Sequence, residues 1–384
     1  MTVVVNAVAA KMGGAATYLR AVVTELQARA APHRFVFFVP ASQAGLGERL
    51  PDSICWHPIR VGEGSWLRRL WWDQVTLRRR LREHRADVLL SFSDFGVFGC
   101  PVPQLLIFQN PLYFSELFQR HILPRKGWWF SLLYRLRRWL VCRSAALADR
   151  VLTPSASMLA MVRRAVPLSD GKATVNYFGA AAPAAPPMRN YDGPIRLLFP
   201  TYYADHKNFA TALQALQLVR QRHGDRFRLV TTADPLWVLA RLTGTWRRDL
   251  ELLEELGEGA VEVVGLLPHE RLLELYGQCH VMCYPTLAES FGFPLVEALA
   301  CGLPVVASDI PVNRELARDA ALYFDPFDAG QLAAGIEEIV TNADLRAALQ
   351  QRGRRYAPEF SWARHTEELV RQLEELAASP ARKR

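Results

Sequence analysis

Short apolar runs alternate with segments of helical periodicity along almost the whole chain, and this alternation limits the folds open to it. In the first half, the runs TVVVNAV, RFVFFVP, ADVLLSFS, QLLIFQN and DRVLTPS predict buried strands. The first run is followed by a glycine-containing loop, residues 9–14, and by a predicted helix, residues 16–30, whose leucines and valines share one face. Runs of Val, Ile and Leu separated by helices are typical of parallel sheets covered on both faces.

The alternation restarts after residues 179–194, where a stretch rich in Ala and Pro predicts a linker. Beyond it, IRLLFP, FRLVTTA, VEVVGLL, HVMCYP and PVVAS predict five strands. Helices are expected to begin at Phe209, Trp246, His269 and Pro294. A chain of 384 residues is long enough for two cores. We therefore predict an α/β fold of two Rossmann-like, doubly wound parallel-sheet domains, residues 1–185 and 190–360, facing each other across a cleft where ligands of such sheets bind.

The six cysteines stand at irregular spacings without a CxxC pair, and no signal peptide precedes them, so we expect reduced thiols in a cytoplasmic protein. Cys279, His280 and Cys283 share an apolar, strand-like run whose alternation would scatter them over both faces. We therefore expect no metal site there. No apolar stretch approaches the ~18–20 residues of a membrane-spanning helix.

The densest motif is LAESFGFPLVEALACGLPVVASDIP, residues 287–311. Pro294 suits the first turn of a helix, because an N–H there has no helical partner, and Gly302 is a natural helix stop. The backbone amides from Ser290 to Leu295 should then point out of the start of this helix, and Gly292 would allow a ligand to approach closely. Such a helix start favours an anion, typically a diphosphate.

Two glutamates, Glu289 and Glu297, bracket this helix start with seven residues between them. In a continuous helix they would lie about 12 Å apart at ~1.5 Å per residue, whereas the paired carboxylates of a retaining glycosidase stand ~5–5.5 Å apart. We therefore predict separate roles: Glu297 accepts hydrogen bonds from two vicinal hydroxyls, as carboxylates do for ribose, and Glu289 reaches a sugar. The alternative is that both are surface residues favoured near a helix start by its dipole.

Two further elements fit an anionic ligand. A strand ends at Pro200 and Asn208 is a predicted N-cap, so Lys207 would stand beside a helix start and could neutralise a phosphate. A lysine in this position is otherwise solvated. Gly13 and Gly14 follow the first strand and would place the amides of another helix across from this ligand, although most glycine pairs only make turns.

Together these elements resemble the family 4 retaining glycosyltransferases, which have the GT-B architecture. The resemblance covers most of the chain and is strongest over residues 263–326, where GLLPHERLLELY, the AESFGFPLVEALACGLPVVAS block and ALYFDPFD follow the family pattern in order. It implies an N-terminal acceptor domain, a C-terminal donor domain and a helix at 361–378 that packs back on the first domain. It also implies a nucleotide diphosphate sugar as donor substrate, with no metal and no other cofactor.

The resemblance assigns a role to each matching position. Glu289 contacts the donor sugar, Lys207 binds the diphosphate, and both are catalytic candidates, whereas Glu297 binds the ribose hydroxyls. The full implied donor set is Glu297, Lys207, Gly13, Gly14, Leu267, Ser290, Phe291, Gly292 and Phe293.

The sequence departs from the family pattern at two places. Where many members have an arginine before the lysine, this chain has Thr201, Tyr202 and Tyr203. Where many have a histidine, it has Gln109 and Asn110. Gln and Asn can hydrogen-bond a sugar but cannot act as a base, so these two are acceptor-side candidates. This suits the family's proposed front-face mechanism, in which the departing phosphate takes the acceptor's proton.

Charge is divided unequally along the chain. Residues 1–185 carry 24 Lys and Arg against 11 Asp and Glu, a balance of +13, and residues 186–384 carry 22 against 27, a balance of −5. Two segments, 66–85 and 120–143, interleave Trp and Leu with arginine and predict helices that lie on an anionic membrane surface. The alternative is helices packed on their own sheet with a basic face exposed. No recognisable module supports nucleic-acid binding.

The sequence thus predicts a hexosyltransferase that acts with retention on a membrane-associated glycan or lipid-linked saccharide, in the cytoplasm or peripherally on the inner face of the membrane. The alternatives are an epimerase or hydrolase of the same fold and a non-catalytic membrane-bound module. Uridine and guanosine diphosphate donors fit the sequence equally well.

Overall fold

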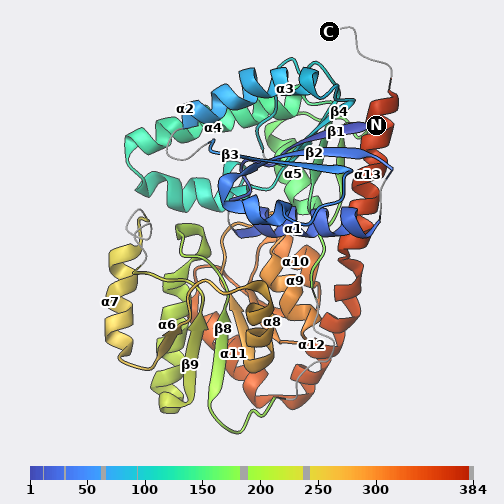
Figure 1. Cartoon of the computed structure of the whole chain (residues 1–384). Helices are drawn as coiled ribbons and strands as arrows, with labels where there is room; N and C mark the ends of the chain where they lie inside the picture. Colours follow the sequence, from blue (N-terminus) through green and yellow to red (C-terminus); the bar gives the residue numbers. More distant parts are fainter. Residues whose placement is uncertain are drawn as a thin grey trace. The chain divides into compact units, whose positions relative to one another are not determined.

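The computed structural model describes residues 1–11, 13–29, 32–61, 66–92, 94–181, 189–236 and 243–379. The chain divides into two compact units, coloured along the sequence in Figure 1. Unit 1 contains Met1–Phe114, Trp129–Gly179 and Ser361–Arg384, and unit 2 contains Ser115–Trp128 and Ala180–Phe360. Part of the predicted linker, residues 182–188, lies outside the described residues.

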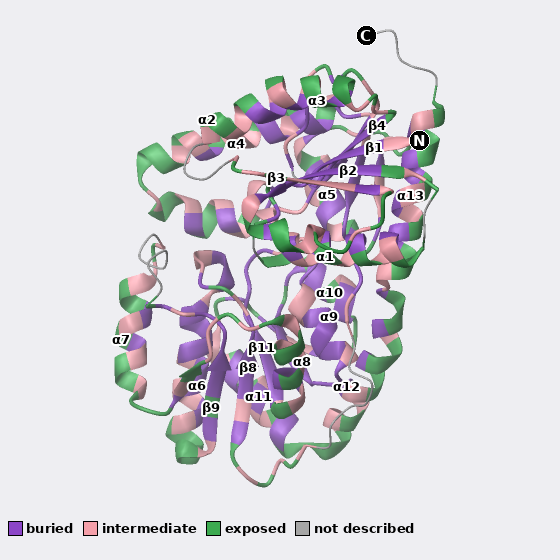
Figure 2. Cartoon of the chain, in the orientation of Figure 1, coloured by how far each residue is buried: buried purple, intermediate pink, exposed green. Residues whose placement is uncertain are grey.

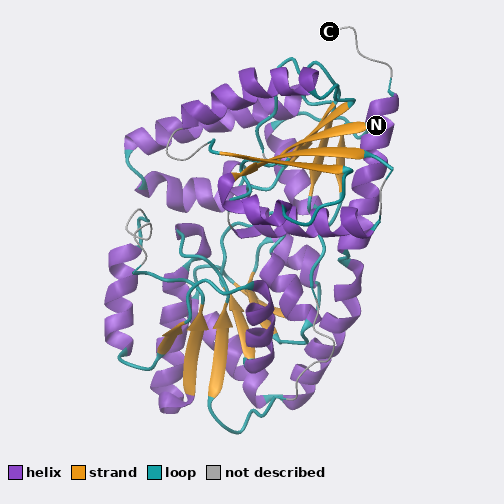
Figure 3. Cartoon of the chain, in the orientation of Figure 1, coloured by secondary structure: helices purple, strands orange, loops and turns teal. Residues whose placement is uncertain are grey.

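Unit 1 is built on a sheet of parallel strands, drawn in orange in Figure 3. Its described residues form seven strands in the order β3-β2-β1-β4-β5-β6-β7. The strands are β1 (Thr2–Asn6), β2 (Arg34–Pro40), β3 (Ile54–Ile59), β4 (Val88–Ser91), β5 (Gln104–Ile107), β6 (Arg150–Thr153) and β7 (Ala173–Val175). At its centre, Val4 pairs with Val36 on one side and Leu89 on the other, and all three are fully buried. The five predicted runs each contain one of these strands, whereas the edge strands β3 and β7 were not predicted.

Helices flank this sheet. The helices of unit 1 are α1 (Gly13–Ala28), α2 (Trp66–Trp71), α3 (Leu77–Glu83), α4 (Trp128–Leu147), α5 (Ala156–Ala165) and α13 (Trp362–Ala378). A π-helical turn, η2 (Trp72–Thr76), joins α2 to α3. The buried face of α1 includes Leu19, Val22, Val23 and Leu26, the face that its sequence predicts.

The final helix, α13, packs on α1 and β4 within unit 1. Its His365 is buried, with Nε2 2.8 Å from the Tyr18 hydroxyl and Nδ1 3.2 Å from the Tyr177 carbonyl. Because a carbonyl only accepts, Nδ1 carries the proton and Nε2 accepts from Tyr18. The chain passes close to α13 at Gly179, where a Cβ would stand 2.3 Å from the backbone nitrogen of Trp362. His365 and Gly179 therefore fix α13 against the body of unit 1.

Unit 2 contains a second parallel sheet, with six described strands in the order β10-β9-β8-β11-β12-β13. They are β8 (Ile195–Phe199), β9 (Phe227–Thr231), β10 (Val261–Val263), β11 (Val281–Tyr284), β12 (Val305–Ser308) and β13 (Ala321–Phe324). The helices are α6 (Phe209–His223), α7 (Trp246–Leu256), α8 (His269–Gln278), α9 (Phe293–Ala300), α10 (Pro311–Ala317), α11 (Ala329–Thr341) and α12 (Ala343–Tyr356). The predicted strands and helix starts all have counterparts here, and β13 was not predicted.

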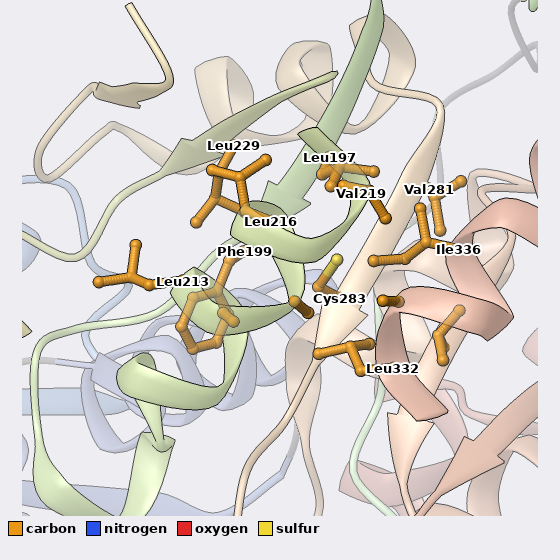
Figure 4. Packing of buried hydrophobic residues seen from close by; sticks show 14 of the residues in the cluster. Leu197, Phe199, Leu213, Leu216, Val219, Leu229, Val281, Cys283, Leu332 and Ile336 are labelled. Carbon is orange, nitrogen blue, oxygen red and sulfur yellow. The ribbon is translucent and has the colours of Figure 1, made fainter. Parts of the chain in front are cut away.

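The core of unit 2 lies where α6 and α11 cover one face of this sheet (Figure 4). Leucines of α6 and the Leu332 and Ile336 side chains of α11 meet strand residues such as Leu197 and Cys283. Side chains alternate across a strand, so Tyr284, the neighbour of Cys283, points to the opposite face. Tyr284 is the last residue of β11 and therefore lies at the carboxyl edge of the sheet.

We predict that His365 makes the free energy of unfolding depend on pH. Burial lowers the His365 pKa to about 4, whereas a histidine in an unfolded chain titrates near 6.5, so between these values the unfolded state binds more protons. The stability is fully present above about pH 6.5 and falls as pH drops to about 4, by up to roughly 1.4 kcal/mol per unit. Urea unfolding of the wild type and of His365→Gln at about pH 7 and about pH 5 checks this. The variant should lack the extra loss, and an equal pH dependence would contradict the assignment.

Candidate active site

A buried ion pair lies at the carboxyl edge of the unit 2 sheet. Lys207 ends a short 3-10 turn, η6 (Asp205–Lys207), that follows β8, and Glu289 lies in the loop between β11 and α9. The Lys207 Nζ donates to Glu289 Oε1 at 2.6 Å, and the two side chains are only 9% and 11% exposed. The structure therefore brings together the two residues that the sequence analysis named as catalytic candidates, a contact that it did not predict.

The surroundings of Lys207 keep it positively charged. Burial alone would lower the Lys207 pKa, but the Glu289 carboxylate and Tyr202 together raise it above its ordinary value. The Tyr202 ring centroid lies 5.3 Å from Nζ. Burial and the charge of Lys207 lower the pKa of the adjacent His206 well below its usual range, so His206 is neutral. A cation held in this way can bind an anionic ligand with little loss of mobility on binding.

Asn208 joins the turns around Lys207. Its backbone is left-handed, with φ 59°, and its side-chain amide donates to the carbonyls of Pro285 at 3.1 Å and Pro326 at 2.7 Å. Asn208 occupies the N-cap position of α6 as predicted, but the predicted capping contact was wrong because its side chain makes no cap hydrogen bond to the helix backbone. The Asn208 side chain instead ties its own turn to two other loops, the one at Pro285, which leads to Glu289, and the one at Pro326.

The start of α9 lies on the same side of unit 2 as Glu289. Gly292 is its N-cap, with φ +79°, and Pro294 occupies its first turn as predicted. The Leu295 amide donates to the Gly292 carbonyl at 3.0 Å, so the prediction that outward-pointing amides extend to Leu295 was wrong. The Phe291 side chain is buried and packs on Phe293 and Phe360. Ser290 and Gly292 are the small residues of this loop.

Glu289 and Glu297 have different surroundings. Glu289 Oε1 also accepts from Thr286 Oγ1 at 3.0 Å. Glu297 lies inside α9, nearly buried, where it accepts from the Tyr276 hydroxyl at 3.0 Å and lies 2.8 Å from His269 Nε2. Tyr276 and His269 belong to α8, and the sequence analysis assigned no role to either. The two carboxylates are thus held by separate sets of donors, as separate roles require.

The other predicted residues lie at several places. Leu267 is half-buried on the loop before α8, two residues ahead of His269. Gly13 and Gly14 open α1 in unit 1, where Gly13 has φ +60°. Gln109 and Asn110 follow β5 in unit 1, and both backbone amides donate to Asp94 Oδ1, at 2.9 and 3.1 Å. Burial raises the Asp94 pKa to about 6 despite these two hydrogen bonds. The sequence analysis did not identify Asp94, which fixes the Gln109–Asn110 turn.

A segment of the first half of the chain belongs to unit 2. Ser115–Trp128 groups with unit 2, whereas the sequence analysis placed it in the N-terminal domain. Its Lys126 forms a 2.6 Å ion pair with Asp205, and both side chains are largely buried. Asp205 also accepts from the Gly244 amide at 2.7 Å. Asp205 opens the turn that ends at Lys207, so Lys126 helps to hold that turn.

The basic, aromatic segments 66–85 and 120–143 each combine a packed face with an exposed one (Figure 2). In α4, Leu140 and Val141 are buried, whereas Trp128, Trp129 and Trp139 are 77%, 56% and 60% exposed. Trp71 of α2 is also well exposed, and Trp72 beside it is buried.

Within the described residues, no helix combines the length and apolar character needed to cross a membrane. In the same residues, no group of three or more His, Cys, Asp or Glu could hold a metal ion.

Comparisons with known protein families cover both units. Residues 12–182 match the family described as Glycosyltransferase Family 4, and residues 186–356 match Glycosyl transferases group 1. The chain is 32% identical over 170 residues to the O-antigen chain mannosyltransferase B of Escherichia coli, a match that covers 43% of this chain and 42% of that protein. It is 33% identical over 129 residues to a D-inositol 3-phosphate glycosyltransferase of Corynebacterium jeikeium, covering 33% and 30%. These matches span less than half the length of either relative.

Solved structures share the fold over nearly the whole chain. A sucrose-phosphate synthase of Thermosynechococcus elongatus has a TM-score of 0.77 at 19% identity and covers 99% of this chain and 100% of that one. WaaG, a glycosyltransferase involved in lipopolysaccharide biosynthesis, has a TM-score of 0.71 at 17% identity, covering 97% and 99%. Anabaena Alr3699/HepE in complex with UDP-glucose has a TM-score of 0.70 at 16% identity, covering 98% and 100%.

Two parallel-sheet α/β units with these structural neighbours define the GT-B fold. The chain belongs to the family 4 glycosyltransferases, and the fold and family that the sequence motifs implied are confirmed.

We predict that Asn208 holds the site together through its side chain and not only through its backbone. Asn208→Ala removes the side-chain hydrogen bonds to Pro285 and Pro326 and the one that Asn208 accepts from Thr211, and it places alanine in a left-handed conformation, so it should lower the free energy of unfolding by about 2–4 kcal/mol. Asn208→Gly keeps the conformation and loses only the hydrogen bonds, so its loss should be smaller by about 1 kcal/mol. Denaturant unfolding of both variants measures the difference. Wild-type stability of Asn208→Gly would show that the bridges to Pro285 and Pro326 contribute nothing.

Proposed function

We propose that this protein is a retaining hexosyltransferase that moves a sugar from a nucleotide diphosphate sugar to a saccharide or lipid-linked acceptor. The observation that carries the proposal is the Lys207–Glu289 pair beside the start of α9. A diphosphate brings negative charge that must be neutralised as the glycosidic bond breaks, and a buried lysine at a helix start supplies this stabilisation.

Each glutamate then has its own substrate group. In our proposal the diphosphate draws the Lys207 ammonium away from Glu289, which frees that carboxylate to accept from donor-sugar hydroxyls. Glu297 exchanges its contact with the partly exposed His269 for the ribose hydroxyls and keeps the buried Tyr276. Gly292 allows the loop backbone to approach the phosphates, and Ser290, Phe293 and Leu267 line the same side of the donor.

The acceptor side of the proposal involves unit 1. Gln109 and Asn110 are held by Asp94 and can hydrogen-bond an acceptor hydroxyl without removing its proton. We therefore propose that the departing phosphate takes this proton, which suits transfer with retention. In this scheme Lys207 carries the charge-neutralising role, and the reaction requires no metal or other cofactor.

The comparisons support this choice of substrates. Among the similar proteins, one is described as an O-antigen chain mannosyltransferase, another acts in lipopolysaccharide biosynthesis, and a third was solved with UDP-glucose. These descriptions favour a nucleotide-sugar donor and a glycan acceptor, and donors carrying uridine or guanosine diphosphate both remain candidates.

We predict that removing either member of the pair abolishes most transfer. Panels of UDP-sugars and GDP-sugars are assayed with saccharide and lipid-linked acceptors, and the anomeric configuration of the product is read by NMR. Lys207→Ala and Glu289→Ala should each lower kcat/KM by roughly 100-fold or more, because an electrostatic contact to the leaving group or sugar is lost. The product should keep the donor's anomeric configuration.

Arg222→Ala is the matched control for this experiment. Arg222 pairs with Glu337 at the other end of α6, so its loss removes a surface ion pair without touching the site. Unchanged rates in both site variants would refute their roles. An inverted product would refute retention, and full donor turnover without any acceptor would point to a hydrolase or epimerase.

We also propose that the exposed aromatic and basic faces of residues 66–85 and 129–143 lie on an anionic lipid surface. Exposed tryptophans beside arginines provide apolar insertion together with headgroup attraction. This proposal places the acceptor on a membrane and the enzyme peripherally on its cytoplasmic face.

Vesicle sedimentation tests this surface. The wild type should bind phosphatidylcholine vesicles that contain phosphatidylglycerol more strongly than vesicles of phosphatidylcholine alone, and added salt should weaken the binding. The double variant Trp129→Ser and Trp139→Ser should lose most of this binding. Phe327→Ser, which removes an exposed aromatic residue of unit 2, should not. Equal binding of the wild type and the double variant would contradict the proposal.

A further inference from the structure

One polar atom inside the unit 2 site lacks a partner. The Tyr284 side chain is fully buried at the end of β11, and its hydroxyl has no hydrogen-bond partner among the described residues. Leaving a buried hydroxyl unpaired costs free energy, whereas a phenyl ring would fill the same space without this cost. The hydroxyl therefore calls for an explanation in terms of what the site does.

The Tyr284 hydroxyl lies among the residues of the proposed donor site. A Cβ added to Gly292 would stand 3.1 Å from this oxygen, so the glycine at the N-cap of α9 leaves room for it. Burial raises the Tyr284 pKa well above its usual value, and Glu289 raises it further, both through its charge and as a side-chain hydrogen-bond acceptor near the hydroxyl, although the two groups do not form a well-aligned hydrogen bond. At neutral pH the hydroxyl keeps its proton and remains a hydrogen-bond donor.

Glu289 will need a second donor when ligand binds. Without ligand, its Oε1 accepts from Lys207 and from Thr286. Once the diphosphate takes Lys207, the carboxylate keeps only Thr286 in a largely buried position, where an under-solvated charge is costly. Glu297 is already held by a buried tyrosine hydroxyl, that of Tyr276.

We infer that Tyr284 is a positioning residue for Glu289, whose hydroxyl donates to the carboxylate when Lys207 turns to the donor diphosphate. The inference rests on the proposed function. When the hydrogen bond from Tyr284 replaces the one from Lys207, Glu289 stays directed at the donor sugar during transfer. The contacts of the protein to the nucleoside and the phosphates stay unchanged. In this inference Tyr284 acts through Glu289, and not by a contact of its own with the sugar or the phosphates.

Tyr284→Phe tests this inference on the full-length enzyme. With the UDP-sugar or GDP-sugar that supports transfer, kcat should fall by about tenfold to 100-fold because Glu289 is misplaced, and the donor KM should rise because the carboxylate loses a donor in the bound state. Affinity for UDP or GDP, measured by isothermal titration calorimetry, should also fall, because both ligands carry the diphosphate that draws Lys207 away from Glu289. The Tm should stay level or rise because an unpaired hydroxyl has been removed. In a Glu289→Gln background, the same substitution should cause no further loss of kcat.

Tyr191→Phe is the matched control. The Tyr191 hydroxyl donates to the His280 carbonyl at 2.8 Å, next to the amino end of β11, so this variant loses a satisfied hydrogen bond away from the site. It should lower the Tm and leave kcat unchanged. Two results would overturn this inference and leave the proposed function standing. One is a wild-type kcat for Tyr284→Phe, and the other is an equal fall in kcat when Tyr284→Phe is made in the wild type and in the Glu289→Gln background. Wild-type transfer by Lys207→Ala and Glu289→Ala would instead overturn the proposed function on which it rests.

Discussion

The site of this enzyme depends on a lysine and a glutamate that are held together almost out of water. Burying two opposite charges costs desolvation free energy, which their attraction offsets only when the geometry is good and further donors are present. Here the 2.6 Å contact of Lys207 with Glu289 is supported by the Thr286 hydroxyl. Such a pair contributes little net stability, and in our proposal it keeps a charged lysine ready for an anion at the start of α9.

The parallel sheet explains why these residues meet. Every strand of unit 2 ends at the same edge, so the loops after β8 and β11 converge although about 80 residues separate Lys207 from Glu289 along the chain. Asn208 then ties the loops together through the carbonyls of Pro285 and Pro326. On the far side of the turn, Asp205 is held by Lys126 from a segment that precedes α4. The site is thus fixed by contacts between segments that are distant in sequence.

Local patterns determined how much could be predicted. The long apolar runs gave the central strands, and Pro294 with Gly302 bounded α9 closely. The strand β3 escaped prediction because ICWHPI contains His and Pro, which break the apolar pattern, and β7 has only three residues. The partners of Glu297 could not be predicted, because nothing in the sequence of α8 shows that His269 and Tyr276 face α9. The unpaired hydroxyl of Tyr284 could be recognised only in the folded chain.

The proposed function depends on one event: when a donor diphosphate binds, the Lys207 ammonium moves from Glu289 to a phosphate oxygen. A crystal structure of the protein with UDP or GDP bound measures this directly. We expect a phosphate oxygen within hydrogen-bonding distance of Lys207 Nζ, beside Gly292, with the contact from Lys207 to Glu289 lengthened or broken. A diphosphate bound elsewhere, with the 2.6 Å contact of Lys207 and Glu289 intact, would contradict it.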